Sequence, residues 1–347
     1  MLTVGIIGCG YWGPNLIRNF INLDDVRVKT CSDLLDERLN HMKKIYQSIE
    51  TTKDYKDIIN DSEIDAVVVA TPVSTHFKLA EEALNAGKHV FCEKPLTNKI
   101  EDGIRLIKLA DEKELTLLVG HTFVYTAAVN KMKEVIESGE LGEIYYLSSS
   151  RLNLGLFQKD INVVWDLAPH DISIINYILG DSPVSVSSSG FSYIRSPIED
   201  VGFLTLRYPD SIVANLHVSW LNPNKIRTTT VVGSKKMLVY DDISSLEKIR
   251  IYDKGVDVIP HYDTFGEFHL SYRYGDIDIP KLIDKEPLKV ECQHFIDCIH
   301  TKGVPLSSGR DGLEVMLVLD SAGKSMRQQN KEVKIEYPDI LSDSNRR

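Results

Sequence analysis

The first 120 or so residues alternate short apolar runs with stretches of helical length. Apolar runs of about 4–8 residues are typical of strands that are buried on both faces. Strands separated by helices imply right-handed crossovers and a parallel sheet. We therefore predict a doubly wound α/β domain, with strands at Leu2–Ile7, Val26–Cys31, Ala66–Ala70, Val90–Cys92 and Leu115–Val119 and helices at Pro14–Ile21, Leu35–Ser48, Thr75–Ala86 and Ile100–Glu114.

The pattern changes after about residue 122. Segments of strand character now follow one another with short turns, as at 208–211 and 233–234, which indicates antiparallel pairing. We predict an α+β second domain with a large, mostly antiparallel open sheet. Its predicted helices are Thr126–Ser138, Asp166–Leu179, about 290–301 and 311–328, and its strands are Ile144–Arg151, Val184–Tyr193, Gly202–Tyr208, Ile212–Trp220, Thr228–Val232, Lys236–Tyr240 and Lys248–Tyr252.

A chain of 347 residues has room for two such domains. We place the first domain at 1–122 and the second at 123–340. The polar tail at 341–347 is expected to fray.

The first predicted strand runs directly into a GxGxxG turn that opens a helix, which is the context of a dinucleotide-binding motif. The first glycine allows the tight turn, the second lets the backbone approach a pyrophosphate, and the third lets the helix pack on the strand. The alternative is a glycine-rich turn without a ligand. The cofactor-binding candidates here are Gly8, Gly10, Tyr11, Trp12 and Gly13.

Asp33 ends the second predicted strand, 20 residues after Gly13. A carboxylate at this place can accept hydrogen bonds from the adenosine ribose hydroxyls, and it repels a 2′-phosphate. Positions 34 and 35 are leucine rather than arginine, and Arg38 follows one helical turn later. NAD is therefore favoured over NADP, with Asp33 and Arg38 as further cofactor-binding candidates.

The segments after the third and the fourth predicted strands lie at the edge where a doubly wound sheet binds its ligand. Thr71, Pro72, Ser74 and His76 follow the third strand as cofactor-binding candidates, and the alternative for His76 is a structural role.

Glu93-Lys94-Pro95 follows the fourth strand. A lysine there can orient or polarise a substrate hydroxyl or carbonyl, or exchange a proton if its pKa is lowered. The alternative is a solvated lysine. Its position favours function, so Glu93 and Lys94 join the cofactor-binding candidates and Lys94 is also a catalytic and substrate-binding candidate.

Asp166 and His170 are spaced four residues apart, which places them on one face of a helix. A carboxylate beside an imidazole can orient it and raise its basicity. The spacing alone leaves two alternatives open, since Asp166 can also be the N-cap of the helix and His170 a structural histidine. Pro169 is expected within the first helical turn, where proline is tolerated.

The GCGYWG turn, the Glu93-Lys94-Pro95 triplet and the DLAPHD segment at 166–171 occur in this order across both predicted domains. In this the sequence resembles the Gfo/Idh/MocA oxidoreductases over nearly its whole length, and the triplet is the most diagnostic part. The resemblance implies a Rossmann domain with a mostly antiparallel second domain, NAD(P) binding, and oxidation or reduction of sugars and cyclitols. It also implies that Lys94 and His170 flank the reacting carbon with Asp166 beside them.

Within the family, the resemblance is to nucleotide-sugar 3-dehydrogenases of surface-polysaccharide biosynthesis, which act on UDP-N-acetylglucosamine or its uronic acid. The segments 120–125 and 151–155 carry this likeness. In the family, a glycine-rich run often precedes the aspartate that corresponds to Asp166. In this sequence, residues 162–165 read Asn-Val-Val-Trp instead. The substrate-binding candidates are His121, Tyr125, Arg151, Asn153, Trp165, Asp166 and His170 beside Lys94, and Lys225 and Arg227 are further cations for a diphosphate, with plain surface charge as the alternative for each cation.

The sequence thus predicts NAD-dependent oxidation of a sugar hydroxyl to a ketone, at C3 of a UDP-sugar. The alternatives are a free-sugar or inositol dehydrogenase, an NAD-recycling glycosidase, and a non-catalytic NAD-binding regulator. An acid/base pair speaks against the regulator, because a pure binder has no need of one.

Composition limits the partners. The net charge of −10 disfavours nucleic acid. There is no apolar stretch of about 18 residues and no basic leader, so we expect a cytoplasmic protein without a membrane span. The five cysteines form no CxxC pair, so no metal site is expected, and Cys9, Cys31 and Cys92 are predicted to be small buried hydrophobes. The uncovered face of an open sheet predicts a homodimer or homotetramer.

Overall fold

The computed structural model describes residues 1–155, 157–158, 161–257, 271–283 and 285–342. The chain divides into two compact units. The first unit comprises Met1–Thr126, Lys285–Leu317 and the residues from Tyr337 onward, and the second comprises Ala127–Asp284 and Val318–Glu336. The predicted tail at 341–347 lies mostly outside the described residues.

The first unit holds a six-stranded parallel sheet in the order β3-β2-β1-β4-β5-β6, which is the order of a Rossmann fold. The predicted doubly wound domain is confirmed. The strands are β1 (Leu2–Ile7), β2 (Val26–Ser32), β3 (Glu50–Thr52), β4 (Ala66–Val69), β5 (His89–Glu93) and β6 (Leu117–Gly120), and the helices between them are α1 (Gly13–Ile21), α2 (Asp36–Ile45), α3 (Lys56–Ile59), α4 (Val73–Asn85) and α5 (Ile100–Glu112).

Two short elements, β3 and α3, were not predicted from the sequence. The strand β3 is only three residues long and reads Glu-Thr-Thr, and α3 is four residues long. Neither is long enough to show a hydrophobic period, so pattern reasoning passes over them.

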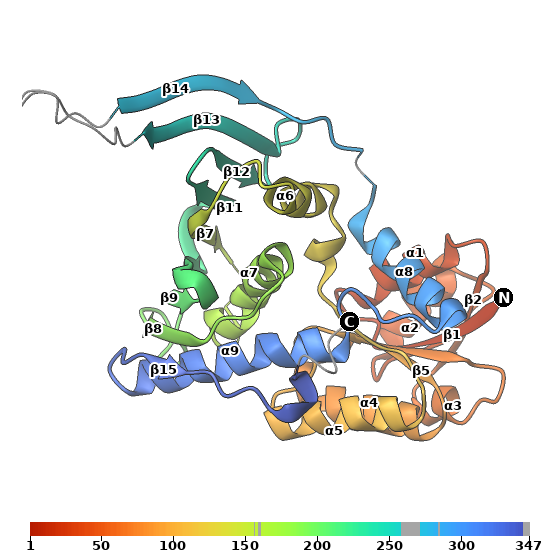
Figure 1. Ribbon diagram of the computed structural model, residues 1–347. Coiled ribbons are helices and arrows are strands. Elements are labelled where there is room, and N and C mark those ends of the chain that lie inside the picture. The colour runs from red at the N-terminus through yellow and green to blue at the C-terminus, as the bar shows by residue number, and fades with distance from the viewer. Residues whose placement is uncertain (156, 159–160, 258–270, 284, 343–347) are drawn as a thin grey trace, which may run out of the picture. The chain divides into compact units, whose positions relative to one another are not determined.

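Helix α8 (Pro287–Thr301) belongs to the first unit, which corrects the prediction of a single boundary near residue 122. It lies beside α1 (Figure 1). Phe295 of α8 packs edge-to-face against Phe20 and Phe91, with ring centroids 6.3 and 5.7 Å away. The same core takes in Leu288, Cys292 and Ile296. The chain returns because the apolar face of α8 is buried there.

The second unit is built on a nine-stranded sheet in the order β14-β13-β12-β11-β7-β10-β9-β8-β15. Among the strand pairs that the structure describes in this sheet, β7–β10 alone is parallel, so the predicted, mostly antiparallel sheet is confirmed. Its strands are β7 (Ile144–Leu154), β8 (Ser185–Phe191), β9 (Val201–Arg207), β10 (Val213–Ser219), β11 (Leu221–Gly233), β12 (Met237–Asp241), β13 (Ile249–Asp257), β14 (Ser271–Asp278) and β15 (Val333–Lys334).

Three longer helices and three 3₁₀ turns complete the described elements. They are α6 (Ala127–Glu137), α7 (Val163–Leu179), α9 (Gly309–Arg327), η1 (Thr122–Tyr125), η2 (Pro209–Ser211) and η3 (Asp339–Leu341). Within the described part of the chain, every helix is too short or too polar to cross a bilayer.

Helix α7 begins earlier than predicted. Asn162 is its N-cap, since the side-chain oxygen accepts a hydrogen bond from the Trp165 amide at 3.0 Å. Asp166 is therefore not the N-cap. Pro169 is the seventh helical residue rather than a first-turn residue, which corrects that expectation. The helix ends at Gly180, whose φ of 70° is left-handed.

A buried ion pair links β7 to α7. The Arg151 guanidinium donates to both carboxylate oxygens of Asp171, at 2.7 and 3.1 Å, and both side chains are about 5% exposed. Ser149 donates a further hydrogen bond to Asp171 at 2.9 Å. The pair fixes the face of α7 that lies against the sheet.

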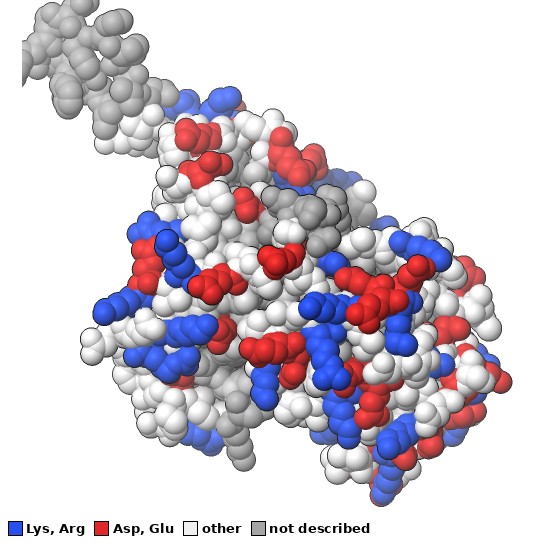
Figure 2. All heavy atoms as spheres, turned by 60° about the horizontal axis from the view of Figure 1, so that its bottom comes forward, with Lys and Arg blue, Asp and Glu red and all other residues white. Residues whose placement is uncertain are grey.

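The surface carries interleaved charges. Figure 2 shows Lys and Arg side chains set among Asp and Glu side chains on the face that it draws. The ion pairs of the first unit include Arg310 with Asp111 and Arg105 with Glu81. Interleaved charge on an acidic chain does not favour a phosphate polymer.

We predict that Asp171→Ala lowers the free energy of unfolding of the protein by about 3–5 kcal/mol, because it leaves the Arg151 charge buried without its carboxylate. Urea unfolding measures this loss. The double variant Arg151→Met, Asp171→Leu should recover most of it. Lys324→Ala, which removes an exposed pair with Asp320, is the control and should change stability by less than about 1 kcal/mol.

Candidate cofactor site and catalytic residues

The turn from β1 to α1 leaves no room for side chains at two of its glycines. Gly8 has a φ of 102°, and a Cβ atom there would lie 2.4 Å from the Ala70 carbonyl oxygen. A Cβ on Gly13 would lie 2.0 Å from the Gly8 carbonyl oxygen. At Gly10 the nearest atom to such a Cβ is 3.7 Å away, so this backbone is open to a close approach. These three environments are those that a pyrophosphate-binding turn requires.

Tyr11 and Trp12 lie at the tip of the same turn. Tyr11 is 82% exposed and Trp12 is 41% exposed, and their rings meet edge to face with centroids 5.5 Å apart. Large exposed rings beside a cofactor turn are compatible with their prediction as cofactor contacts, which stays a prediction.

Asp33 lies directly after β2 and is 9% exposed. Its carboxylate accepts hydrogen bonds from the Cys9 and Leu35 amides at 2.8 and 3.0 Å, and from the Arg38 guanidinium at 3.2 Å. Burial works to raise the pKa of Asp33, but these three donors outweigh it and hold the pKa below its ordinary value. Asp33 is thus an oriented anion with acceptor capacity left for ribose hydroxyls.

The segment after β4 is tied to the segment after β5 by His76. Its Nε2 lies 2.8 Å from the Thr71 carbonyl oxygen and its Nδ1 lies 2.9 Å from the Pro95 carbonyl oxygen. Burial lowers the pKa of His76, although both carbonyl contacts act to raise it. These two backbone contacts fit the structural role that was the alternative for His76, and its contact with the cofactor stays a prediction. The neighbouring Thr71 hydroxyl bonds the Thr75 hydroxyl at 2.7 Å, and Pro72 precedes α4. Ser74 is exposed in the first turn of α4.

Glu93 is the last residue of β5 and Lys94 follows it, at the carboxyl edge of the sheet. Glu93 is 7% exposed. Burial raises the pKa of Glu93 to about 7, although the charge and the backbone amide of Lys94 act to lower it. The site therefore places a cation next to a carboxyl group that titrates near neutral pH, which is a common feature of catalytic sites.

His121 follows β6 and is 2% exposed. Neither ring nitrogen has a hydrogen-bond partner among the described residues. Burial lowers the pKa of His121 to about 3, and the charge of Lys94 acts in the same direction. His121 is thus a neutral imidazole near Lys94. Tyr125, also predicted as a sugar contact, is buried and its hydroxyl lies 2.9 Å from that of Ser307.

The second unit carries Asp166 and His170 on one face of α7, as predicted. The Asp166 carboxylate accepts a hydrogen bond from the indole of Trp220 at 2.9 Å, and Trp220 is buried. Trp165 is half-buried in the first turn of the same helix. Because Asn162 is the N-cap, Asp166 does not cap the helix.

Arg151 and Asn153 lie on β7. The ion pair with Asp171 accounts for the buried Arg151 without a ligand, so its predicted role with the substrate has no support from its surroundings. Arg227 pairs with Asp242 at 3.1 Å, and Lys225 is exposed. Asn153 is half-buried and stays a prediction.

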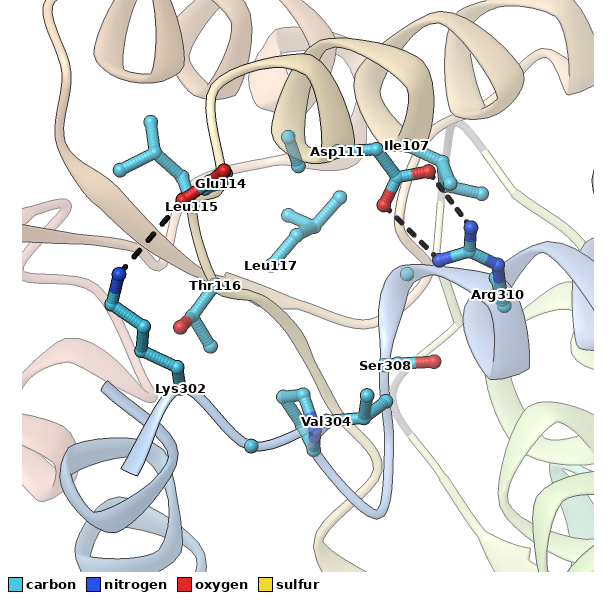
Figure 3. A pocket seen from close by; sticks show the side chains of 14 residues that line it. Ile107, Asp111, Glu114, Leu115, Thr116, Leu117, Lys302, Val304, Ser308 and Arg310 are labelled. Carbon is cyan, nitrogen blue, oxygen red and sulfur yellow. Dashed lines mark hydrogen bonds and ion pairs between the residues drawn. The ribbon is translucent and has the colours of Figure 1, made fainter. Parts of the chain in front are cut away.

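A cavity of about 370 Å³ lies elsewhere in the first unit. Figure 3 shows it at the start of β6, between α5 and the start of α9, with Lys302 paired to Glu114 and Arg310 paired to Asp111. A doubly wound sheet binds its ligand at the carboxyl ends of its strands. This cavity is at the amino end of β6, so it is not the cofactor site.

Sequence reasoning missed Glu291 of α8 and Thr122 of η1. Glu291 is fully buried, and one of its oxygens accepts a hydrogen bond from the Thr122 hydroxyl at 2.7 Å. The available signal was a glutamate on the apolar face of an amphipathic helix. Among the described residues, no group of three His, Cys, Asp or Glu side chains could hold a metal ion. The prediction that Cys9, Cys31 and Cys92 are buried hydrophobes is confirmed.

Comparison with known proteins agrees with this geometry. The family model "Oxidoreductase family, NAD-binding Rossmann fold" matches residues 2–121, and the "GFO/IDH/MocA C-terminal domain" model matches residues 129–239. Together they cover well over half of the sequence. The chain therefore belongs to the Gfo/Idh/MocA family of oxidoreductases, and its first unit contains an NAD-binding Rossmann domain.

Three relatives illustrate the range. The chain is 26% identical to the myo-inositol 2-dehydrogenase of Thermotoga maritima, over 96% of this chain and 99% of that protein. It is 27% identical to the UDP-N-acetylglucosamine 3-dehydrogenase of Acidithiobacillus ferrooxidans, over 74% of this chain and 76% of that protein. The solved structure of the same enzyme matches 95% of this chain and 99% of its own chain, with a TM-score of 0.77 and 23% identity. The match to the uncharacterized oxidoreductase YrbE of Bacillus subtilis, at 26% identity, spans 58% of this chain and 60% of that protein.

We predict that Asp33→Ala weakens NAD binding at least about tenfold, because a charge-assisted hydrogen bond to the ribose is lost. Isothermal titration calorimetry measures the change. The matched control is Asp36→Ala, which removes an exposed carboxylate of α2 that pairs with Lys53. An unchanged affinity in Asp33→Ala would argue against the ribose role.

The raised pKa of Glu93 predicts a pH-dependent stability. Between its ordinary value of 4.5 and about 7, the folded protein binds this proton more tightly than the unfolded chain does. Stability should therefore fall as pH rises through this window, by up to about 3 kcal/mol. Melting temperatures at pH about 5 and about 8 test this. Glu93→Gln should remove this part of the fall, whereas Glu101→Gln, at an exposed position of α5, should not.

Proposed function

We propose that the protein oxidises a secondary hydroxyl of a sugar to a ketone by hydride transfer to NAD, at C3 of UDP-N-acetylglucosamine or of its uronic acid. The observation that carries the proposal is Lys94, which stands at the carboxyl edge of the Rossmann sheet beside the buried Glu93. The UDP-N-acetylglucosamine 3-dehydrogenase among the relatives supports this substrate class.

In the proposed mechanism, the turn at Gly8–Gly13 holds the cofactor pyrophosphate against the N-terminus of α1. Asp33 accepts hydrogen bonds from the adenosine ribose. NAD bound there would supply the hydride acceptor. His170 removes the proton of the reacting hydroxyl and Asp166 orients the imidazole. Lys94 hydrogen-bonds the same oxygen and stabilises the negative charge that develops on it.

A free-sugar or inositol substrate is the second candidate. The myo-inositol 2-dehydrogenase of Thermotoga maritima supports it, because that relative matches over 96% of this chain and 99% of its own length. The same residues would perform the same chemistry on a cyclitol, so only a substrate panel separates the two. A regulator that binds NAD without catalysis has no need of the Lys94 and His170 pair.

For the assembly we propose a homodimer or homotetramer, formed through the sheet of the second unit. On β9, Leu204 and Leu206 are buried whereas Phe203 is 45% exposed, and Tyr146 of β7 is 46% exposed. Exposed rings on one face of an antiparallel sheet are typical of a face that a second copy covers. The five buried thiols, without disulfides, are in keeping with a cytoplasmic enzyme.

The test is the formation of NADH, followed by its absorbance at about 340 nm, a property of the reduced nicotinamide. We expect a UDP-sugar to give a higher kcat/KM than myo-inositol or glucose. Lys94→Ala should lower kcat at least about a hundredfold while NAD binding, measured by calorimetry, is retained.

The control for that variant is Lys99→Ala, which removes an exposed lysine next to the same loop. Normal turnover in Lys94→Ala would refute the assignment of Lys94. A preference for myo-inositol would leave the mechanism in place and replace the substrate.

A further inference from the structure

A buried polar cluster lies in the first unit, close enough to Lys94 that its charge acts on Glu93 and His121. Three elements contribute to it, namely the end of β5 with Glu93, the residues after β6 with His121 and Thr122, and α8 with Glu291. The Glu93 carboxylate lies against the backbone of β6, since a Cβ atom on Gly120 would lie 3.1 Å from its Oε2. The mechanism proposed above uses Lys94 and gives no role to Glu291.

Glu291 has little to stabilise a negative charge. It is 0% exposed, and its Oε2 accepts one hydrogen bond, from the Thr122 hydroxyl at 2.7 Å. Its Oε1 has no partner among the described residues. Removing an ionised carboxylate from water costs several kcal/mol, and a single hydrogen bond from a neutral hydroxyl does not offset this. The geometry thus favours the protonated form of Glu291.

Glu93 adds to this preference. Burial raises the pKa of Glu291 well above its ordinary value, and the negative charge of Glu93 raises it further, against the opposing effect of Thr122. Two buried carboxyl groups that feel each other's charge do not both ionise readily. Of the two, Glu93 ionises first, because only Glu93 has the charge and amide of Lys94 beside it.

The other titratable groups around the pair are neutral near pH 7. His121 is kept neutral by burial and by Lys94. Burial also raises the pKa of the Cys92 and Cys292 thiols and of the Tyr125 phenol. Among these described groups, Lys94, Glu93 and Glu291 therefore decide the charge of the cluster.

We infer that Glu291 is a positioning residue for the proposed reaction: it stays protonated, anchored to Thr122, so that Glu93 alone supplies the negative charge that faces Lys94. The inference rests on the proposed function, because it assigns Lys94 the task of stabilising the reacting oxygen. One anion against one cation leaves the ammonium able to turn to that oxygen. A second buried anion would hold the ammonium in place and cancel its field.

The protonation of Glu291 is tested first, on the full protein without substrate. Infrared spectra at pH about 8, above the pKa of about 7 of Glu93, should contain the carbonyl band of a protonated carboxyl group that is absent in Glu291→Gln. The same band should persist in Asp297→Asn, the matched control, which changes an exposed carboxylate of the same helix. A wild-type spectrum that is identical to that of Glu291→Gln in this region overturns the inference, whether or not any sugar is turned over.

The effect on the reaction is tested by the pH dependence of kcat between about 7 and about 9.5, below the range of free lysine. Glu291→Gln keeps a neutral group of the same shape, so we expect kcat near pH 7 within about twofold of the wild type. We also expect the wild-type kcat to fall at the pH at which the infrared band of protonated Glu291 is lost, and this fall to be absent in Glu291→Gln. A purely structural glutamate would not change the shape of the profile.

Two results overturn the positioning role. One is a loss of kcat of more than about tenfold in Glu291→Gln with an unchanged melting temperature, which would show that the charge of Glu291 is needed. The other is a wild-type kcat that does not change at the pH at which the infrared band of protonated Glu291 is lost. If no sugar reduces NAD, the proposed function fails, and the infrared result still decides the charge of Glu291.

Discussion

The turn between β1 and α1 is the constraint on which the first unit depends. The backbone of Gly13 approaches the Gly8 carbonyl so closely that no side chain fits, and Gly8 itself has a left-handed conformation against Ala70. This contact fixes the direction of α1 and leaves the Gly10 backbone open. Asp33 is then held beside the turn by the Cys9 amide, so the same few residues define both the fold and the place of the cofactor.

The charges of Glu93 and His121 depend on burial more than on contacts with oppositely charged groups. Glu93 titrates near neutral pH because it is buried, and His121 is neutral for the same reason. Lys94 acts on both groups through its charge. A water-filled site with the same residues would have a carboxylate at pH 7 and a histidine that titrates near its ordinary value. The strand ends that close this region are therefore part of its chemistry.

Much of the fold could be predicted from the sequence, because apolar strands such as Ala66–Val69 alternate with clearly amphipathic helices. The glycine turn, Asp33 and the Glu93-Lys94 pair could be placed because each directly follows such a strand. Arg151 could not be interpreted, since its partner Asp171 is twenty residues away on another element. The burial of Glu291 could not be predicted for a related reason, because it depends on packing between α8 and a segment 169 residues earlier in the chain.

The return of α8 to the first unit has a consequence for biosynthesis. Phe20 and Phe91 leave the ribosome early, but Phe295 completes their cluster only when most of the chain has been made. A nascent chain usually completes its amino-terminal domain first. Here the apolar surface of the Rossmann sheet that α8 covers stays exposed while β7 to β14 of the second unit are synthesised. The unit that begins the chain is therefore the last to be completed. Chaperones that shield apolar surface can bind it for the whole of that interval.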